Sequence, residues 1–235
     1  MTRPEIRAAT LGGLRAAAGV PLLLVGGGMS GFGALAHDIG FTGWEAVLAT
    51  VAVWALPAQV VAAEMHAAGA DLTAIAIAAA LTSMRFFPMA VALLPTLGGD
   101  VGPLGRIAQA HLMSATSWAF MTRASVPQEP GPRRAYHSAF TITCLSVAAV
   151  ATLAGYLGAA ALPAPLALGL LFLNAAFFMV LLADSRNRQA LLAVVLGALL
   201  CWPIHAVLPE ASLVLAGVAG GTLAFVFGDR LRGAA

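Results

Sequence analysis

The residue with the clearest chemical potential is an arginine, Arg85, in the middle of an apolar segment. It lies in the run Leu81-Thr-Ser-Met-Arg-Phe-Phe-Pro-Met89, with apolar sequence on both sides from Leu72 to Leu97. A charge at membrane depth costs about 2.5–3.5 kcal/mol on insertion scales, and such residues usually face a partner or a cavity. Because a guanidinium binds a carboxylate through two parallel hydrogen bonds, Arg85 is a candidate carboxylate-binding group. The alternative is that it caps a half-helix or extends to the membrane interface.

A predicted helix break accompanies this arginine. Pro88 has no N–H group, so the helical hydrogen bond to the carbonyl of Met84, directly beside Arg85, cannot form. Ser83 lies two residues before the arginine and is a candidate neutral binding group. Phe86, followed by a second phenylalanine, offers an apolar surface for an aliphatic side chain.

An earlier apolar segment carries a similar combination, Trp54-Ala-Leu-Pro-Ala-Gln59. Pro57 removes a backbone donor and leaves an upstream carbonyl free, and Gln59 places an amide two residues later. Gln59 is therefore a second candidate binding group. A kink with one interhelical hydrogen bond also explains the pattern.

Glycines are dense in the first apolar segment, which has Pro21 and then Val25-Gly-Gly-Gly-Met-Ser-Gly-Phe-Gly33. Each glycine in a helix costs about 0.5–1 kcal/mol relative to alanine. One interpretation is an unwound stretch at Gly26, Gly27 and Gly28, whose free backbone groups meet a polar substrate near the midplane. The other is close packing of helices through faces of small residues.

Three further polar residues are candidates for a role in binding or coupling. His111 lies deep in a polar fourth segment, and Glu64 lies near the end of the second. Both are candidates for carrying a coupling proton, although a group near a segment end commonly meets water instead. Asn174, inside the sixth segment, is a candidate to line a cavity or to join two helices.

Residue sets typical of catalysis or metal binding do not appear. The sequence has no G-x-S-x-G, no H-E-x-x-H and no paired intramembrane aspartates. Cys144 and Cys201 both lie in apolar stretches, which disfavours a disulfide and leaves a metal without ligands. We therefore expect no enzyme, no cofactor and no metal site.

The composition indicates which elements must position these residues. Of 235 residues, 60% are hydrophobic and 9% are charged, against about 25% charged in soluble domains. The 49 residues 135–183 contain no charged residue. As one helix they would span roughly 74 Å, more than twice a hydrocarbon core of about 30 Å. The sequence predicts an all-α polytopic membrane bundle, and it has no basic stripe for nucleic acid.

The apolar segments predict about seven to eight spans, with the first and third interrupted. Prolines in the segment 126–135 predict a cytoplasmic linker between an N-terminal half, 1–125, and a C-terminal half, 136–235. The predicted spans are 16–36, 44–63, 72–97, 104–122, 138–162, 166–183, 189–208 and 211–228.

Arginines gather on one side of eight such spans. By the positive-inside rule, both termini are then expected in the cytoplasm, and only Arg106 falls on the opposite side. The arginines on the expected cytoplasmic side are Arg3, Arg7, Arg15, Arg123, Arg133, Arg134, Arg186, Arg188, Arg230 and Arg232.

The order of these motifs resembles the AzlC family of branched-chain amino acid permeases. The likeness lies in Gly31-Phe-Gly-Ala-Leu-Ala36 after Pro21, in Leu56-Pro-Ala-Gln59, and in Ser83-Met-Arg85 with Leu94-Pro95 beyond. The order of the later spans also fits. The resemblance implies export of branched-chain and similar amino acids across the bacterial cytoplasmic membrane, with proton exchange. It also implies a small four-helix AzlD-type subunit that completes the permease.

The chain departs from the family pattern at several positions. Ser83 stands where the family usually has Asn, Ala115-Thr116 where an Asp-Glu pair is frequent, and Leu171 where an acidic residue is common. The carboxylates best suited to carry a coupling proton are then missing, and the chain resembles a divergent member.

We therefore expect an inner-membrane permease that exports a branched-chain or similar small amphipathic amino acid, with Arg85 at the substrate carboxylate. Assembly into a homo-oligomer stays open. The competing hypothesis is a non-transporting membrane scaffold or accessory subunit, in which Arg85 pairs across a protein interface. That hypothesis predicts a polar partner surface on the third span and no closed central pocket.

Overall fold

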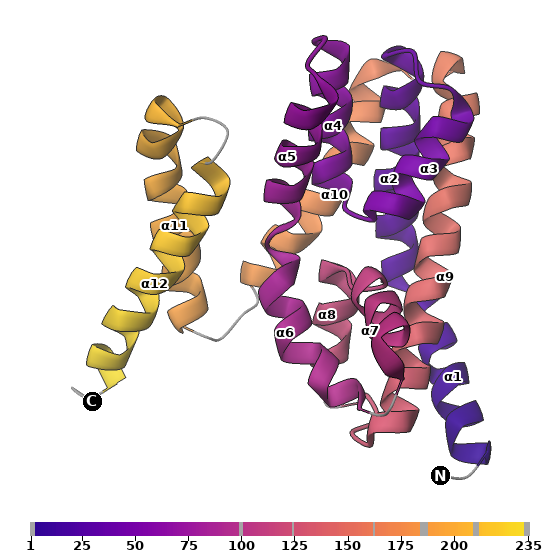
Figure 1. Cartoon of the computed structure of the whole chain (residues 1–235), viewed down its shortest axis with the longest axis vertical. Coiled ribbons are helices and arrows are strands. Elements are labelled where there is room, and N and C mark those ends of the chain that lie inside the picture. Colours follow the sequence, from indigo (N-terminus) through magenta and orange to yellow (C-terminus); the bar gives the residue numbers. More distant parts are fainter. Residues whose placement is uncertain are drawn as a thin grey trace.

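The computed structural model of the chain describes residues 3–98, 101–123, 125–161, 163–183, 188–208 and 212–232. Every regular element in these ranges is a helix, which confirms the predicted all-α membrane bundle (Figure 1). The elements are α1 (Arg3–Ala17), α2 (Val20–Asp38), α3 (Gly43–Val53), α4 (Leu56–Ala67), α5 (Leu72–Ser83), α6 (Phe86–Leu97), α7 (Gly102–His111), α8 (Ala115–Met121), α9 (Pro130–Leu157), the 3-10 helix η1 (Ala159–Ala161), α10 (Ala164–Ala183), α11 (Arg188–Val207) and α12 (Ser212–Arg232).

Three of the described helices are long and apolar enough to cross a membrane by length and composition. They are Val20–Asp38, Pro130–Leu157 and Gln189–Val207. The pair α5 and α6 meets the same test together, bent by 55° at the break that holds Met84 and Arg85. This bend confirms the predicted interruption of the third span.

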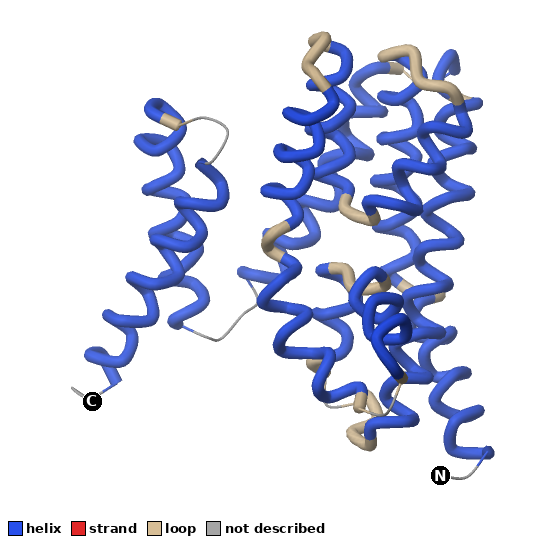
Figure 2. Tube along the Cα trace, viewed as in Figure 1, coloured by secondary structure: helices blue, strands red, loops and turns tan. Residues whose placement is uncertain are grey.

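Helices α3 and α4 form a hairpin that enters and leaves at the same end of the bundle. Phe41, just before α3, contacts the ring of His66 in the last turn of α4, with ring centroids 5.1 Å apart. The other ends of the two helices meet at Trp54 and Ala55, about halfway along the bundle (Figure 2). The predicted second span, 44–63, therefore turns back instead of crossing.

Helices α7 and α8 form a second hairpin, which enters from the opposite end. Arg133, near the start of α9, donates to the carbonyl of Met121 at the end of α8 (2.9 Å) and to Thr96 Oγ1 near the end of α6 (3.0 Å). Because α7 follows α6 in the chain, the hairpin leaves from and returns to this end. The predicted fourth span, 104–122, is thus also a hairpin and not a crossing.

The first eight helices form two units with the same order of elements and opposite directions (Figure 1). In each unit an interrupted span, α1–α2 or α5–α6, is followed by a hairpin that enters where that span ends. The sequence shows no convincing internal repeat, so the relation is visible only in the fold. Inverted repeats with broken helices are typical of transporters, and their binding sites lie near the midplane between the repeats.

Each predicted helix-breaking proline lies in the first turn of a helix, just after a break. Pro21 belongs to α2, Pro57 to α4 and Pro88 to α6. A proline in the first turn costs the helix no hydrogen bond, because an N–H group at that position would have no partner within the helix. The chain therefore breaks two to four residues ahead of each proline and not at the proline itself.

The glycine run does not unwind, which corrects one interpretation of the first span. Gly26, Gly27 and Gly28 are all helical within a continuous α2. A methyl group at Gly27 would lie 2.8 Å from Leu173 Cδ2 of α10, and one at Gly33 would overlap the carbonyl oxygen of Thr152 in α9. The glycines therefore let neighbouring helices approach closely, which is the alternative that the sequence left open.

The segment predicted as a linker, 126–135, is helical from Pro130 onward. Pro130 and Pro132 occupy the first turn of α9, where proline is tolerated. Arg133 is 8% exposed and donates four hydrogen bonds, to Thr96, Met121, Pro127 and Gln128. It therefore holds the ends of α6 and α8 against α9, a role that its expected place in a cytoplasmic loop did not suggest.

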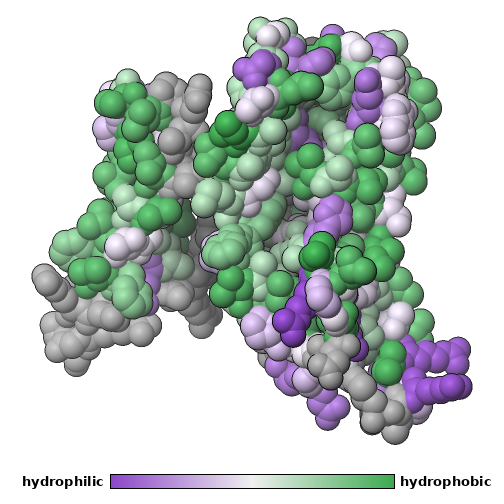
Figure 3. All heavy atoms as spheres, viewed as in Figure 1, coloured by the Kyte–Doolittle hydropathy of each residue, from purple (hydrophilic) through white to green (hydrophobic). Residues whose placement is uncertain are grey.

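The core lies where α2 packs along α9, with Phe32, Phe140 and Cys144 almost fully buried. Helices α11 and α12 form a pair that contacts the remainder through few residues of α5 and α10. Apolar side chains cover most of the sides of both groups (Figure 3), as expected for surfaces that face lipid. The N-terminus and the described end of α12 lie at the same end of the structure.

Candidate functional site

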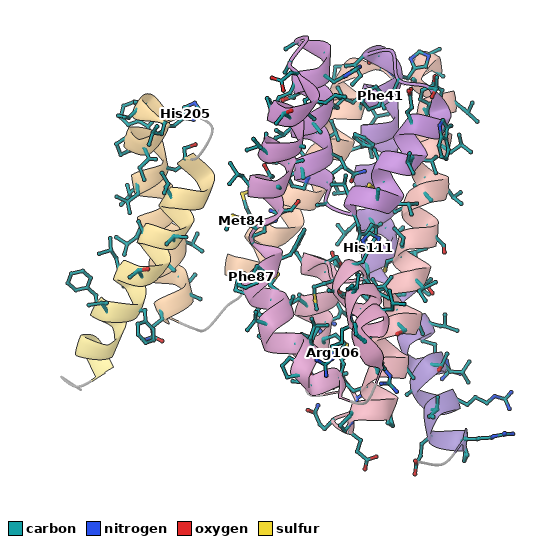
Figure 4. All side chains as sticks on the ribbon, in the orientation of Figure 1. Phe41, Met84, Phe87, Arg106, His111 and His205 are labelled. Carbon is teal, nitrogen blue, oxygen red and sulfur yellow. The ribbon has the colours of Figure 1, made fainter. Side chains whose placement is uncertain are left out.

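The three helix breaks near the middle of the bundle, at the α3–α4, α5–α6 and α7–α8 junctions, all lie in the wall of one cavity. It is lined by Met29 and its neighbours on α2, by Trp54 and the tip of the first hairpin, by Arg85 at the α5–α6 break, and by Ser114 at the tip of the second hairpin. Figure 4 shows Met84 and His111, which flank two of these breaks, about midway along the bundle. The cavity has a volume of about 50 Å³. At about 10–15 Å³ per water it holds roughly three to five waters.

The local sequence explains why the chain breaks at the first hairpin tip. Trp54 ends α3 in a left-handed conformation, with φ 48° and ψ 33°, and Ala55 is extended. Pro57 lies at the second position of α4, where its missing N–H needs no helical partner, so a new helix begins at Leu56 directly after the turn. The first residues of α4 then face the cavity.

The second hairpin tip is set by a capping box. Ser114 Oγ accepts from the backbone N–H of Ser117 (3.1 Å), and Ser117 Oγ accepts from the N–H of Ser114 (2.9 Å). These reciprocal bonds fix the start of α8. Ala115 and Thr116, the first residues of this helix, therefore lie in the cavity wall.

Arg85 lies at the break between α5 and α6, and its side chain is exposed as well as lining the cavity. Its guanidinium carbon lies 5.1 Å from the ring centroid of Phe86, which lines the same cavity. Within the part of the chain that the structure describes, Arg85 has no hydrogen bond or ion pair. The guanidinium is thus available to a ligand.

The electrostatics of the cavity favour an anion. Its wall includes the first residues of α4, α6 and α8, so the positive ends of these helix dipoles point toward it. Arg85 adds a full positive charge, and no Asp or Glu is among the described residues of the wall. A carboxylate in the cavity would meet the guanidinium without competition from a protein acid.

Gln59 does not line this cavity. Its side chain is 1% exposed and donates to Thr50 Oγ1 across 3.0 Å, and Thr50 in turn bonds to Thr152 Oγ1 of α9 across 2.8 Å. This buried network ties both arms of the first hairpin to α9. The structure therefore gives Gln59 the helix-joining role that the sequence left as an alternative.

The remaining predicted site residues are spread over the molecule. Ser83 is half-buried at the end of α5, and Glu64 is exposed on α4 near the end of the bundle opposite the N-terminus. His111 ends α7 and bonds to the carbonyl of Val51 on α3 (2.9 Å). None of these three belongs to the cavity wall. Asn174 belongs to α10, but its side chain lies outside the described residues.

Two buried residues were missed by sequence reasoning. Trp54 lines the cavity and is 5% exposed, and its apolar neighbours in the sequence did not indicate its left-handed conformation. His137 is fully buried on α9, and its Nδ1 lies 3.0 Å from Gln109 Oε1 of α7. The spacing of one helical turn between His137 and Thr141 was the signal in the sequence that could have indicated a shared buried face.

No group of three His, Cys, Asp or Glu side chains that could hold a metal ion occurs among the residues that the structure describes. The arrangement is that of a binding cavity between broken helices, with one cation and no protein anion.

Comparison with known proteins agrees with this architecture. No curated protein and no solved structure matches the chain. The model of one protein family, AzlC protein, matches residues 22–162, a range that includes both hairpins and all three central breaks. Because this match covers more than half of the chain, the protein belongs to the AzlC family.

Proposed function

We propose that the protein is a permease of the bacterial inner membrane that exports branched-chain or similar small amphipathic amino acids. The observation that carries this proposal is Arg85, which lines the cavity at the helix breaks and has no hydrogen bond or ion pair with the described residues. Its guanidinium binds the substrate carboxylate. Phe86 and the apolar residues of α2 in the same wall contact the aliphatic side chain.

The cavity also favours transport over the competing scaffold function. A scaffold needs no central pocket and would pair Arg85 with another protein. Here Arg85 faces a pocket that is bounded by hairpins from opposite ends. The small volume of the cavity, about 50 Å³, means that the hairpins must separate before an amino acid of leucine size enters. Such separation is what alternating access requires.

The fold supports a cytoplasmic position for both termini. Because α7–α8 is a hairpin, Arg106 near the start of α7 lies at the same end as Arg123, Arg133 and Arg134 (Figure 4 labels Arg106). The one arginine that opposed the predicted orientation thus joins the others, and the positive-inside rule assigns this end to the cytoplasm.

A small four-helix subunit of the AzlD type completes the permease, by analogy with the family. The cavity wall has Ala115 and Thr116 where the resemblance implies acids.

The proposal is tested by flux of labelled leucine, valine or methionine into inside-out vesicles. The vesicles carry the protein, its Arg85→Ala variant, or an Arg7→Ala control on the exposed part of α1. We expect Arg85→Ala to lose transport while Arg7→Ala keeps it. Equal transport by all three would remove Arg85 from the site.

A further inference from the structure

Trp54 has an unusual backbone for a bulky residue. It is the one non-glycine residue with positive φ in the described part of the chain, at φ 48°. Bulky side chains are disfavoured there, and such strained residues cluster at functional sites. The strain coincides with the tip of the first hairpin, at the wall of the Arg85 cavity.

Within the described part of the chain, the indole of Trp54 is also left without a hydrogen-bond partner. The side chain is 5% exposed, and its Nε1 is buried without an acceptor from these residues. Buried indole N–H groups usually find a partner, because a buried donor without one is destabilising.

Two backbone acceptors near the hairpin tip are already engaged. The carbonyl of Thr50 accepts from the backbone N–H of Trp54, and the carbonyl of Val51 accepts from His111. The protein thus keeps a strained residue whose one side-chain polar atom has no partner among the described residues. Because Trp54 lines the cavity, a ligand bound there is a candidate acceptor for this donor.

We propose that the Trp54 indole N–H donates a hydrogen bond to the carboxylate of the substrate and shares this group with the Arg85 guanidinium. This inference rests on the proposed function and names the chemical group that the site recognises. Arg85 and Trp54 are both donors without acceptor capacity, and the described wall holds no acid. A carboxylate on the ligand has two oxygens on one carbon, so it can accept one hydrogen bond from each of these donors.

The test compares Trp54→Phe, which removes the N–H and keeps a ring, with Trp44→Phe on an exposed position of α3. Equilibrium binding of labelled leucine to the purified protein is the measurement. Loss of a hydrogen bond to a charged group predicts a Kd about 10- to 100-fold higher for Trp54→Phe and an unchanged Kd for Trp44→Phe. Unchanged affinity in Trp54→Phe overturns the inference.

The two proposals fail in different ways. If Arg85→Ala loses binding while Trp54→Phe keeps it, the proposed function stands and the role of Trp54 is wrong. If neither substitution matters, the proposed function fails as well.

If the Trp54→Phe variant fails to fold, a second measurement tests the same inference with Trp54 in place. The variant with Trp44→Phe, Trp118→Phe and Trp202→Phe retains Trp54 as its single tryptophan. We expect leucine to shift the fluorescence emission of this variant and leucinol, which lacks the carboxylate, to leave it unchanged. No shift with leucine, or an equal shift with leucinol, contradicts the inference.

Discussion

His111 Nε2 donates a hydrogen bond of 2.9 Å to the carbonyl oxygen of Val51, and this bond joins two hairpins that enter the bundle from opposite ends. Because a carbonyl only accepts, Nε2 carries the proton. Both residues lie within three residues of a hairpin tip, so the bond links the two hairpins near their tips. In the proposed transport, an amino acid that passes between the ends of the bundle has to part these tips.

Replacing His111 by alanine removes this link. The loss of one hydrogen bond of about 0.5–1.5 kcal/mol makes separation of the tips about 2- to 13-fold more frequent. We expect a cysteine introduced at Ala55 to react faster with a water-soluble thiol reagent by that factor. His111→Gln, whose amide can donate at a similar reach, serves as the control and should react at the original rate. Equal rates in all three proteins would show that the bond does not hold the tips together.

Close packing of α2 against α9 predicts a strong effect of one methyl group. At Gly33 this group would overlap the carbonyl oxygen of Thr152, so Gly33→Ala forces the helices apart. Overpacking of this kind costs about 1–3 kcal/mol, and the melting temperature in detergent should fall. Gly217→Ala on α12 has open space around the added methyl and should melt like the unmutated protein. A normal melting temperature for Gly33→Ala would contradict the tight α2–α9 contact.

The buried guanidinium of Arg133 predicts a second large loss of stability. Arg133→Ala leaves the Thr96 hydroxyl and the Met121 carbonyl without their donor, and we expect about 2–4 kcal/mol of destabilisation. Arg123→Ala, at an exposed position, is the control. Chemical denaturation of both variants measures the difference. Equal stability would mean that Arg133 does not hold the end of the second hairpin.

The absence of an acid from the described cavity wall predicts the effect of adding one. Ala115→Asp places a carboxylate in the wall that also holds Arg85, and the resulting ion pair competes with the substrate carboxylate. We expect leucine binding to weaken at least tenfold. Ala115→Asn, of similar size and neutral, should bind nearly as well as the unmutated protein. If Asp and Asn weaken binding equally, size and not charge is responsible.

Local sequence predicted which segments contain a break, but not its position to the residue or where the chain goes next. Pro88 and Pro57 indicate a break in each segment, and the structure has both. A kink and a reversal need the same local residues, however, and the choice depends on distant contacts. The reversal after Trp54 is stabilised by Phe41 against His66 at the end of the bundle. No pattern within 44–63 contains that contact.

Only part of the candidate site was predicted, because residue type alone does not show which side chains face the cavity. Arg85 and Phe86 were identified because a charge in an apolar segment is itself a signal, and both line the cavity. Gln59 gave an equally strong signal, but its amide bonds to Thr50. Trp54 gave none, because an aromatic residue in an apolar segment is ordinary and its conformation follows from the turn. Burial and backbone geometry separate these cases, and neither is encoded by residue type alone.

The claim on which the account depends is that Arg85 binds the carboxylate of the substrate. Isothermal titration of the purified protein with leucine and with leucinol tests it most directly, in the unmutated protein and in Arg85→Ala. We predict that leucine binds the unmutated protein, that leucinol binds far more weakly, and that Arg85→Ala no longer distinguishes the two. If Arg85→Ala prefers leucine over leucinol as strongly as the unmutated protein does, Arg85 does not bind the carboxylate.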